Sequence, residues 1–232
     1  MTDLSIRART AEQMDAEDLD AATYAEVLTD LGQVNRLILS RRPTLRFLDE
    51  AVGARTRVRL LDVGFGQGDM LRSIARWAKR RGVAAELVGI DLNPRSETVA
   101  RAATSADLPI DYRTGDYAEL AGAGFDLIVS SLVAHHMSDA ELIAFLRFME
   151  AEATLGWLVA DLRRSAFAYR SFPLLARIMG WHRIVREDGT LSVARSFREG
   201  EWQEMVAAAG GTVGAARIVR RFPFRLCVER IR

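Results

Sequence analysis

The stretch LLDVGFGQGDM, residues 60–70, decides the fold class. Its apolar beginning predicts a buried strand that ends near Val63, and the residues from Asp69 onward predict an amphipathic helix. Between the two, glycine stands at every second position: Gly64, Gly66 and Gly68. Such a turn gathers unpaired backbone N–H groups and the positive end of a helix dipole at one point. It predicts a site where a polar or anionic ligand group approaches the backbone closely.

Strands and helices alternate outward from this turn. That rhythm predicts an α/β, Rossmann-like, doubly wound and mostly parallel sheet, with ligands at the carboxyl ends of its strands. Two extended runs around Phe222 and Pro223 predict an antiparallel pair at one edge, which makes seven strands. The other predicted strands are 57–63, 85–92, 110–116, 125–133 and 155–163, and the helices between them are 69–81, 93–103 and 138–153.

A chain of 232 residues suits a single domain. We expect a helical N-terminal cap over 1–54, a cofactor-binding core over 55–162, a substrate-side insertion or lid over 163–200, and a C-terminal helix and strands over 201–232. Pro43 is expected to divide two helices within the cap. Capping boxes are expected at Ser138 with Glu141 and at Ser196 with Glu199. The mixed aromatic and basic residues of 163–195 fit no single regular element.

Charge and cysteine content exclude several classes of protein. Lys and Arg number 32 against 31 Asp and Glu, so the net charge of +1 gives no reason to expect a nucleic-acid partner. No apolar run reaches the roughly 18 residues that span a bilayer. One cysteine, Cys227, cannot form an intramolecular disulfide, and the N-terminus lacks the pattern of a secretory signal. These features predict a cytoplasmic protein; they do not determine its oligomeric state.

Two carboxylates narrow the ligand class. Asp69 stands where the dinucleotide fingerprint needs its last glycine, and the chain has no phosphate-binding loop with lysine. Asp62, just before the glycines, suits a positively charged group better than a phosphate. Asp91 ends the next strand, where an acid accepts hydrogen bonds from ribose hydroxyls. Ribose together with positive charge predicts S-adenosylmethionine.

Further residues complete the predicted cofactor site. Asp116, after the third strand, is expected to accept a hydrogen bond from the adenine amino group. Leu92 and Tyr117 are expected to offer apolar faces to the ring. Ser130, near the end of the fourth strand, belongs to the same predicted set.

Four segments resemble, in order and spacing, the motifs of class I S-adenosylmethionine-dependent methyltransferases: LLDVGFGQGD, LVGIDLN, YRTGDY and FDLIVSSLVAHHM. The double histidine resembles the small-molecule branch that includes quinone-biosynthesis enzymes. The segment LTDLGQVNRLILSRRPTLRFL is similar to a helical cap of methyltransferases that act on aromatic or polyketide-like products of secondary metabolism. Phe65 departs from the family, which frequently has a small residue there. The resemblance implies methyl transfer to an aromatic hydroxyl or a quinol-like carbon.

His136 is the candidate catalytic residue. Methyl transfer requires an acceptor held in line with the carbon–sulfur bond, and a base helps when the acceptor is a phenol. Imidazole titrates near neutral pH, so His136 is expected to act as a base or to bind substrate, unless it only orients its loop. His135 is expected to point elsewhere. At least two of four aromatic residues are expected to line an acceptor pocket, although scattered aromatics also pack in cores: Phe167, Tyr169, Phe172 and Trp181.

Other readings of the sequence stay open at this point. No metal site is predicted, because the histidines have no cysteine or acid at ligand spacing along the chain. A nucleic-acid or protein methyltransferase would share the cofactor site, but SSLVAHH replaces the Asn-Pro-Pro-Tyr motif of enzymes that methylate base amino groups. A non-catalytic protein that binds the same cofactor would also keep the glycine turn and Asp91.

Overall fold

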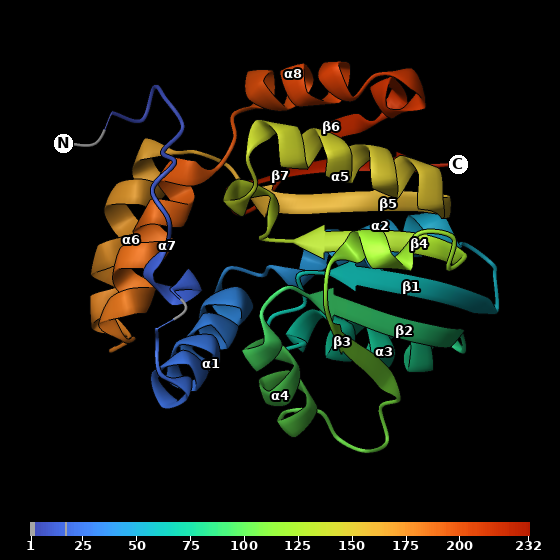
Figure 1. Cartoon of the computed structure of the whole chain (residues 1–232), viewed down its shortest axis with the longest axis horizontal. Coiled ribbons are helices and arrows are strands. Elements are labelled where there is room, and N and C mark those ends of the chain that lie inside the picture. Colours follow the sequence, from blue (N-terminus) through green and yellow to red (C-terminus); the bar gives the residue numbers. More distant parts are fainter. Residues whose placement is uncertain (1–2, 17) are drawn as a thin grey trace.

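A computed structural model describes residues 3–16 and 18–232 (Figure 1). Its centre is a seven-stranded sheet in the order β3-β2-β1-β4-β5-β7-β6. The first five strands are mutually parallel, whereas β7 is antiparallel to both β5 and β6. This confirms the predicted fold class. The strands are β1 (Arg57–Val63), β2 (Ala84–Asp91), β3 (Ile110–Thr114), β4 (Phe125–Ser131), β5 (Ala153–Leu162), β6 (Arg217–Arg221) and β7 (Arg225–Ile231).

Helices cover both faces of the sheet. Leu60 packs with α2 (Arg41–Val52), α3 (Asp69–Arg81) and α4 (Pro94–Ala102), whereas the next residue, Leu61, packs with α5 (Asp139–Glu152) and α8 (Glu199–Ala209) on the other face. Successive side chains of a strand point to opposite faces, so a strand buried on both sides carries a continuous apolar run. This is why the LLDV segment has no alternating pattern.

A third apolar cluster lies beyond the carboxyl ends of the strands. It joins α1 (Ala21–Leu37), α6 (Ala166–Ile178) and α7 (Arg183–Arg195). Figure 1 shows these three helices side by side, facing the arrowheads of the parallel strands. The segment that fitted no regular element in the sequence therefore contains two helices, and with α1 it forms a cover over the ligand-binding edge of the sheet.

Several local predictions can be compared with the structure. Ser138 and Glu141 form the expected capping box of α5, with N–H to side-chain oxygen distances of 2.7 and 3.3 Å. The box predicted at Ser196 is wrong: the backbone N–H of Arg198 donates to Glu201 instead, at 2.6 Å. Ser196 belongs to the end of α7, where its hydroxyl donates to the carbonyl oxygen of Ser192.

The N-terminal fifty residues are mainly helical, as expected, although the α-helices begin only at Ala21. Before α1, the described residues contain only the 3-10 helix η1 (Gln13–Asp15). The other three short 3-10 helices are η2 (Tyr117–Leu120), η3 (Ala134–His136) and η4 (Gly211–Ala215). Pro43 lies in the first turn of α2, and the break from α1 falls just before it. Within residues 3–16 and 18–232, no helix has the length and apolar character needed to cross a membrane.

Candidate active site

A cavity of about 580 Å³ lies between the carboxyl ends of the strands and the α1–α6–α7 cover. This volume falls within the range of about 300–1,000 Å³ that is usual for small-molecule sites. The lining includes residues that follow β1, β2 and β4, together with the N-terminal segment. Of the predicted site residues, these line it: Asp62, Gly64, Gly66, Asp91, Leu92, Tyr117 and His136.

Asp62 is a buried carboxylate without full compensation. Asp62 is the second-last residue of β1, and only 1% of it is exposed. Its Oδ2 has no hydrogen-bond partner among the described residues. Burial, reinforced by the negative charges of Asp69 and Asp91, raises the pKa of Asp62 well above its usual value. A charged group in this position calls for a cation or a hydrogen-bond donor from a ligand.

Asp91 connects the ends of two strands. One carboxylate oxygen accepts a hydrogen bond from the N–H of Gly66 at 2.9 Å, and the other accepts from the N–H of Asn93 at 2.9 Å. Burial raises the pKa of Asp91, although these two N–H groups oppose the shift. The Ser96 hydroxyl also donates to this carboxylate. A carboxylate has about four acceptor positions, so Asp91 fixes the glycine turn and can still accept a hydrogen bond from a ligand.

Gly68, Asp116 and Ser130 lie outside the cavity lining, and each makes a structural contact. A Cβ at Gly68 would lie 2.4 Å from the hydroxyl of Tyr112, and its backbone has φ +75°. Asp116 is exposed, and its carboxylate caps η2 by accepting from the N–H two residues further on, at 2.8 Å. Ser130 is buried and donates its hydroxyl to the carbonyl oxygen of Val63 at 2.9 Å.

The three remaining hydrophobic residues of the predicted site differ in environment. Leu92 is 75% exposed at the cavity rim, so its side chain is free to cover a ring. Tyr117 is half-buried and packs against Phe145 and Phe148, with ring centroids 4.8 Å away in both cases. Phe65 is buried beside Tyr112 at 4.9 Å, so its bulk is accommodated by the core.

The α1 helix is attached directly to the glycine turn. The side-chain amide of Gln67 donates to the carbonyl oxygen of Leu28 at 2.9 Å. A Cβ at Gly32 would lie 2.0 Å from that amide nitrogen, so this approach requires glycine. The hydroxyl of Tyr24 also lies 2.9 Å from that of Ser96 at the start of α4. These contacts place α1 over the cofactor side of the cavity, and Gln67 carried no recognisable signal in the sequence.

Two histidines and an acid meet at the other end of the cavity. Nε2 of His135 lies 3.7 Å, and Nε2 of His136 lies 3.8 Å, from the carboxylate of Glu12. Nδ1 of His135 lies 2.8 Å from Asp161 at the end of β5, and Nδ1 of His136 lies 3.1 Å from Asp15. The expectation that His135 points elsewhere is wrong, because its ring centroid is 4.3 Å from that of His136.

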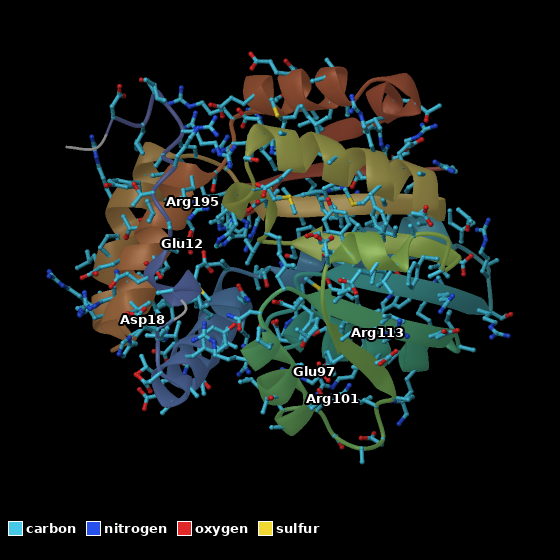
Figure 2. All side chains as sticks on the ribbon, in the orientation of Figure 1. Glu12, Asp18, Glu97, Arg101, Arg113 and Arg195 are labelled. Atoms are coloured by element: carbon cyan, nitrogen blue, oxygen red, sulfur yellow. The ribbon has the colours of Figure 1, made fainter. Side chains whose placement is uncertain are left out.

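The charges of this cluster are held in a buried environment. Burial raises the pKa of Glu12 to about 7, although His136, the Ser192 hydroxyl and Arg195 favour its charged form. Figure 2 shows Glu12 and Arg195 close together where the N-terminal segment passes α7, and their side chains approach to 3.9 Å. The guanidinium of Arg195 also donates to the carbonyl oxygens of both histidines and so fixes their loop.

The carboxylates behind the histidines are held in their charged form. Burial disfavours ionisation of Asp161, but His135 and two backbone N–H groups outweigh it and lower its pKa. Burial of Asp15 is likewise outweighed, chiefly by the hydrogen bond with His136, so its pKa is also lowered. Each histidine therefore has an acceptor at Nδ1, which directs Nε2 toward Glu12.

The aromatic residues of the cover do not all face the cavity. Phe172 lines it together with Leu175, Leu31 and Val34. Phe167 is 68% exposed, and Trp181 is buried between α1 and the cover helices. Of the four aromatic residues considered in the sequence, Phe172 lines the cavity, whereas Phe167, Tyr169 and Trp181 do not. The expectation that at least two of them line the pocket is therefore wrong.

Residues 60–152 match the family model described as a methyltransferase domain. This match runs from β1 through α5 and contains the glycine turn, Asp91 and both histidines of the cluster. This segment is a methyltransferase domain. Glu12 and the helices α1, α6 and α7 lie outside the part of the chain that matches this methyltransferase domain.

Curated relatives match parts of the chain. A ubiquinone biosynthesis O-methyltransferase of Azorhizobium caulinodans is 38% identical over 93 residues, which are 39% of this chain and 34% of the relative. A protein of the same name from Methylobacterium sp. (strain 4-46) is 32% identical over 131 residues, 53% of this chain and 48% of the relative. The chain thus spans less than half the length of each of these relatives.

Solved methyltransferase structures share the fold. The plantazolicin methyltransferase BpumL, in complex with a monoazolic desmethyl analogue and S-adenosylhomocysteine, has a TM-score of 0.66 at 14% identity; the match covers 94% of this chain and 91% of that one. Human N-acetylserotonin methyltransferase in complex with S-adenosylmethionine has a TM-score of 0.64 at 16% identity, covering 94% and 59%. At these identities the likeness establishes the methyltransferase fold alone.

Proposed function

We propose that this protein transfers a methyl group from S-adenosylmethionine to a small organic acceptor, and that the group methylated is an aromatic hydroxyl or a quinol-like carbon. The observation that carries the proposal is the buried carboxylate of Asp62 beside Asp91 at one end of the cavity, whose Oδ2 has no hydrogen-bond partner among the described residues. One end of the cavity therefore suits a ligand with a cationic group and a ribose, and the other end offers imidazole.

The residues at the cofactor end fit S-adenosylmethionine. Asp62 and the N–H groups of the glycine turn would hold its charged amino-acid end, since Oδ2 of Asp62 has no partner within residues 3–16 and 18–232. Asp91 would accept from a ribose hydroxyl through its remaining acceptor position. Leu92 and Tyr117 would cover the adenine faces. Asp116 is proposed to contact the adenine amino group only if η2 rearranges, because it is exposed and engaged in a cap.

The acceptor end supplies proton transfer and exclusion of water. When bound, S-adenosylmethionine supplies an electrophilic methyl group on a sulfonium sulfur. His136 lines the cavity, and its Nδ1 is engaged by Asp15, so Nε2 is the nitrogen that can take the proton of an acceptor hydroxyl. Residues of α1 and α6 enclose this end and would hold the acceptor in line, which is the main requirement of methyl transfer.

The walls of the cavity favour an aromatic acceptor over a macromolecule. Apolar side chains of α1 and α6, including Leu31 and Phe172, face the interior beneath a helical cover. The net charge of +1 gives no general electrostatic reason for a polyanion to bind. We propose a small-molecule partner and no nucleic acid. A cytoplasmic location is proposed as well, since the single cysteine, Cys227, cannot form an intramolecular disulfide.

Calorimetric titration tests the cofactor part of the proposal. The purified protein should bind both S-adenosylmethionine and S-adenosylhomocysteine with micromolar affinity. Asp91→Ala should weaken binding by about tenfold or more, since the ribose hydrogen bond is lost. Asp111→Ala is the matched control, because Asp111 lies on the adjacent strand β3, pairs with Arg113 and is exposed. Failure of the unchanged protein to bind either compound would overturn the proposal.

A further inference from the structure

The two imidazoles at the acceptor end converge on one carboxylate. The candidate ligand atoms of Glu12, His135 and His136 all lie within 4.8 Å of one another. Both Nδ1 atoms face carboxylates, so in the neutral rings Nε2 carries the lone pair and faces Glu12. Three acceptor groups therefore point at a common centre.

Nothing in the described protein occupies that centre as a donor. The Ser192 hydroxyl donates to Glu12 at 2.9 Å, but from the side of α7. The separations of 3.7 and 3.8 Å between Nε2 and the carboxylate exceed those of hydrogen bonds. In a tetrahedral zinc site with bonds of about 2.0–2.1 Å, neighbouring ligand atoms lie about 3.4 Å apart. The two separations from Glu12 are a few tenths of an ångström longer than this, and all three ligand atoms lie within 4.8 Å of one another, so a bound ion would need to draw the three side chains together only modestly.

We propose that Glu12, His135 and His136 bind one divalent transition-metal ion of the zinc type. Two histidines and a glutamate form a known ligand set for sites that keep a further position open. Magnesium and calcium prefer oxygen ligands, so two imidazoles select against them. All three residues line the cavity, and the open position therefore faces the acceptor.

The surroundings of the three residues are those of a supported metal site. A histidine that binds a metal through one ring nitrogen generally donates a hydrogen bond from its other ring N–H to a carboxylate, which orients the ring and raises its basicity. Asp161 and Asp15 serve the two rings in this way. Arg195 fixes the loop by donating to the histidine carbonyl oxygens at 3.1 and 3.2 Å. In the chain, Glu12 precedes His135 by 123 positions, and it lies outside the matched family segment.

The open position selects acceptors that carry a metal-binding oxygen, such as a phenol with a second oxygen beside it. A metal ion polarises such an oxygen and makes its proton easier to remove. With the ion bound, Nε2 of His136 is a ligand and no longer the base. This assignment of the acceptor rests on the proposed function, whereas metal binding itself does not.

Zinc titration of the chelator-treated, full-length protein tests the inference. We expect one equivalent of Zn²⁺ to bind with micromolar or higher affinity, and Co²⁺ to bind with visible absorption bands. Glu12→Gln and His136→Gln should each weaken Zn²⁺ binding by at least about tenfold. His182→Asn is the matched control: His182 lies outside the cluster, and asparagine can replace it as the N-cap of α7.

The variants also separate this inference from the proposed function. Glu12→Gln should keep its affinity for S-adenosylhomocysteine, which shows that the variant is folded. Zinc binding without cofactor binding would support the metal site and overturn the methyltransferase proposal; the reverse would overturn the metal site. The metal site also falls if Zn²⁺ binds the Glu12→Gln protein as tightly as the unchanged one, because the ion would then be held elsewhere.

Discussion

Asp62 is the single residue on which the cofactor proposal rests, and its burial also makes the stability of the protein depend on pH. Its folded-state pKa is raised by burial above 3.8. Its contribution to stability is therefore complete below about pH 3.8 and is lost as the pH rises through the folded-state pKa. Without cofactor, Asp62→Asn should be more stable than the unchanged protein at pH 7, by about 1–3 kcal/mol. Urea denaturation from about pH 4 to 8 measures this, with Asp111→Asn as the control. Parallel curves for the protein and Asp62→Asn would contradict it.

The residues predicted from the sequence are those whose role depends on nearby positions. Asp62, the glycines and Asp91 follow strand ends, and parallel strands bring those ends to one edge. Ser130 shows the limit of that logic, since neighbouring strand residues face opposite ways and the hydroxyl turned to Val63. Glu12 was missed because more than a hundred residues separate it from His135 in the sequence, although the two side chains lie close together in space. A single acidic residue in a loop has no local pattern that would indicate such a contact.

At the level of elements, the contact between α1 and the glycine turn depends on Gly32. Gly32→Ala gains about 1 kcal/mol of helix propensity but forces the Gln67 amide away from Leu28 and loses its hydrogen bond. We expect little net change in the free energy of unfolding. In a Gln67→Ala background, the same substitution should stabilise by about 1 kcal/mol, because the clash is gone. A double-mutant cycle measures the coupling. Equal effects of Gly32→Ala in the two backgrounds would show that the contact is absent.

The cover helices show why some elements escaped prediction. The DGT sequence at residues 188–190 is typical of a turn but lies inside α7. Gly189 is there because the ring of Phe172 packs against it: a Cβ would lie 2.3 Å from that ring. Asp188 accepts hydrogen bonds from the N–H groups of Gln13 and Met14, so it serves the N-terminal segment. The identities of Gly189 and Asp188 are thus explained by tertiary contacts, which the periodicity of the sequence does not indicate.

At the scale of the whole molecule, the sheet and its two helical layers followed from sequence alone, while the closure of the site did not. The layers depend on alternating apolar segments, each readable by itself. The closure depends on residues 3–16, which cross α7 and the β4–α5 loop with polar contacts in place of apolar periodicity. Arg164 is buried there and donates to the carbonyl oxygen of Leu4, a contact that no local pattern of the sequence indicates. Arg225, on β7, is also buried.

Arg7 holds this N-terminal segment in place. Its guanidinium donates to the carbonyl oxygens of Arg195, His135 and Met137, and it pairs with Asp139 at 3.0 Å. The same group lies 3.9 Å from the centre of the Phe197 ring. Because Glu12 follows five residues later, the anchoring of the segment and the geometry of the Glu12 cluster are coupled.

Arg7→Met should therefore loosen the N-terminal segment while the sheet stays intact. Methionine keeps the hydrophobic packing but removes the Arg7 donor from the carbonyl oxygens of Arg195 and Met137 and one of the two donors from that of His135. Amides of residues 4–15 should therefore exchange hydrogen at least about tenfold faster. Amides of β1 and β4 should be unchanged, and Zn²⁺ should bind more weakly because Glu12 is less well positioned. Arg9→Met is the matched control, since the side chain of Arg9 is 60% exposed and pairs with the same Asp139. Hydrogen exchange measured by mass spectrometry distinguishes the two variants. Faster exchange across β1 and β4 in Arg7→Met would mean that the segment stabilises the whole fold, and equal exchange in both variants would mean that Arg7 does not anchor it.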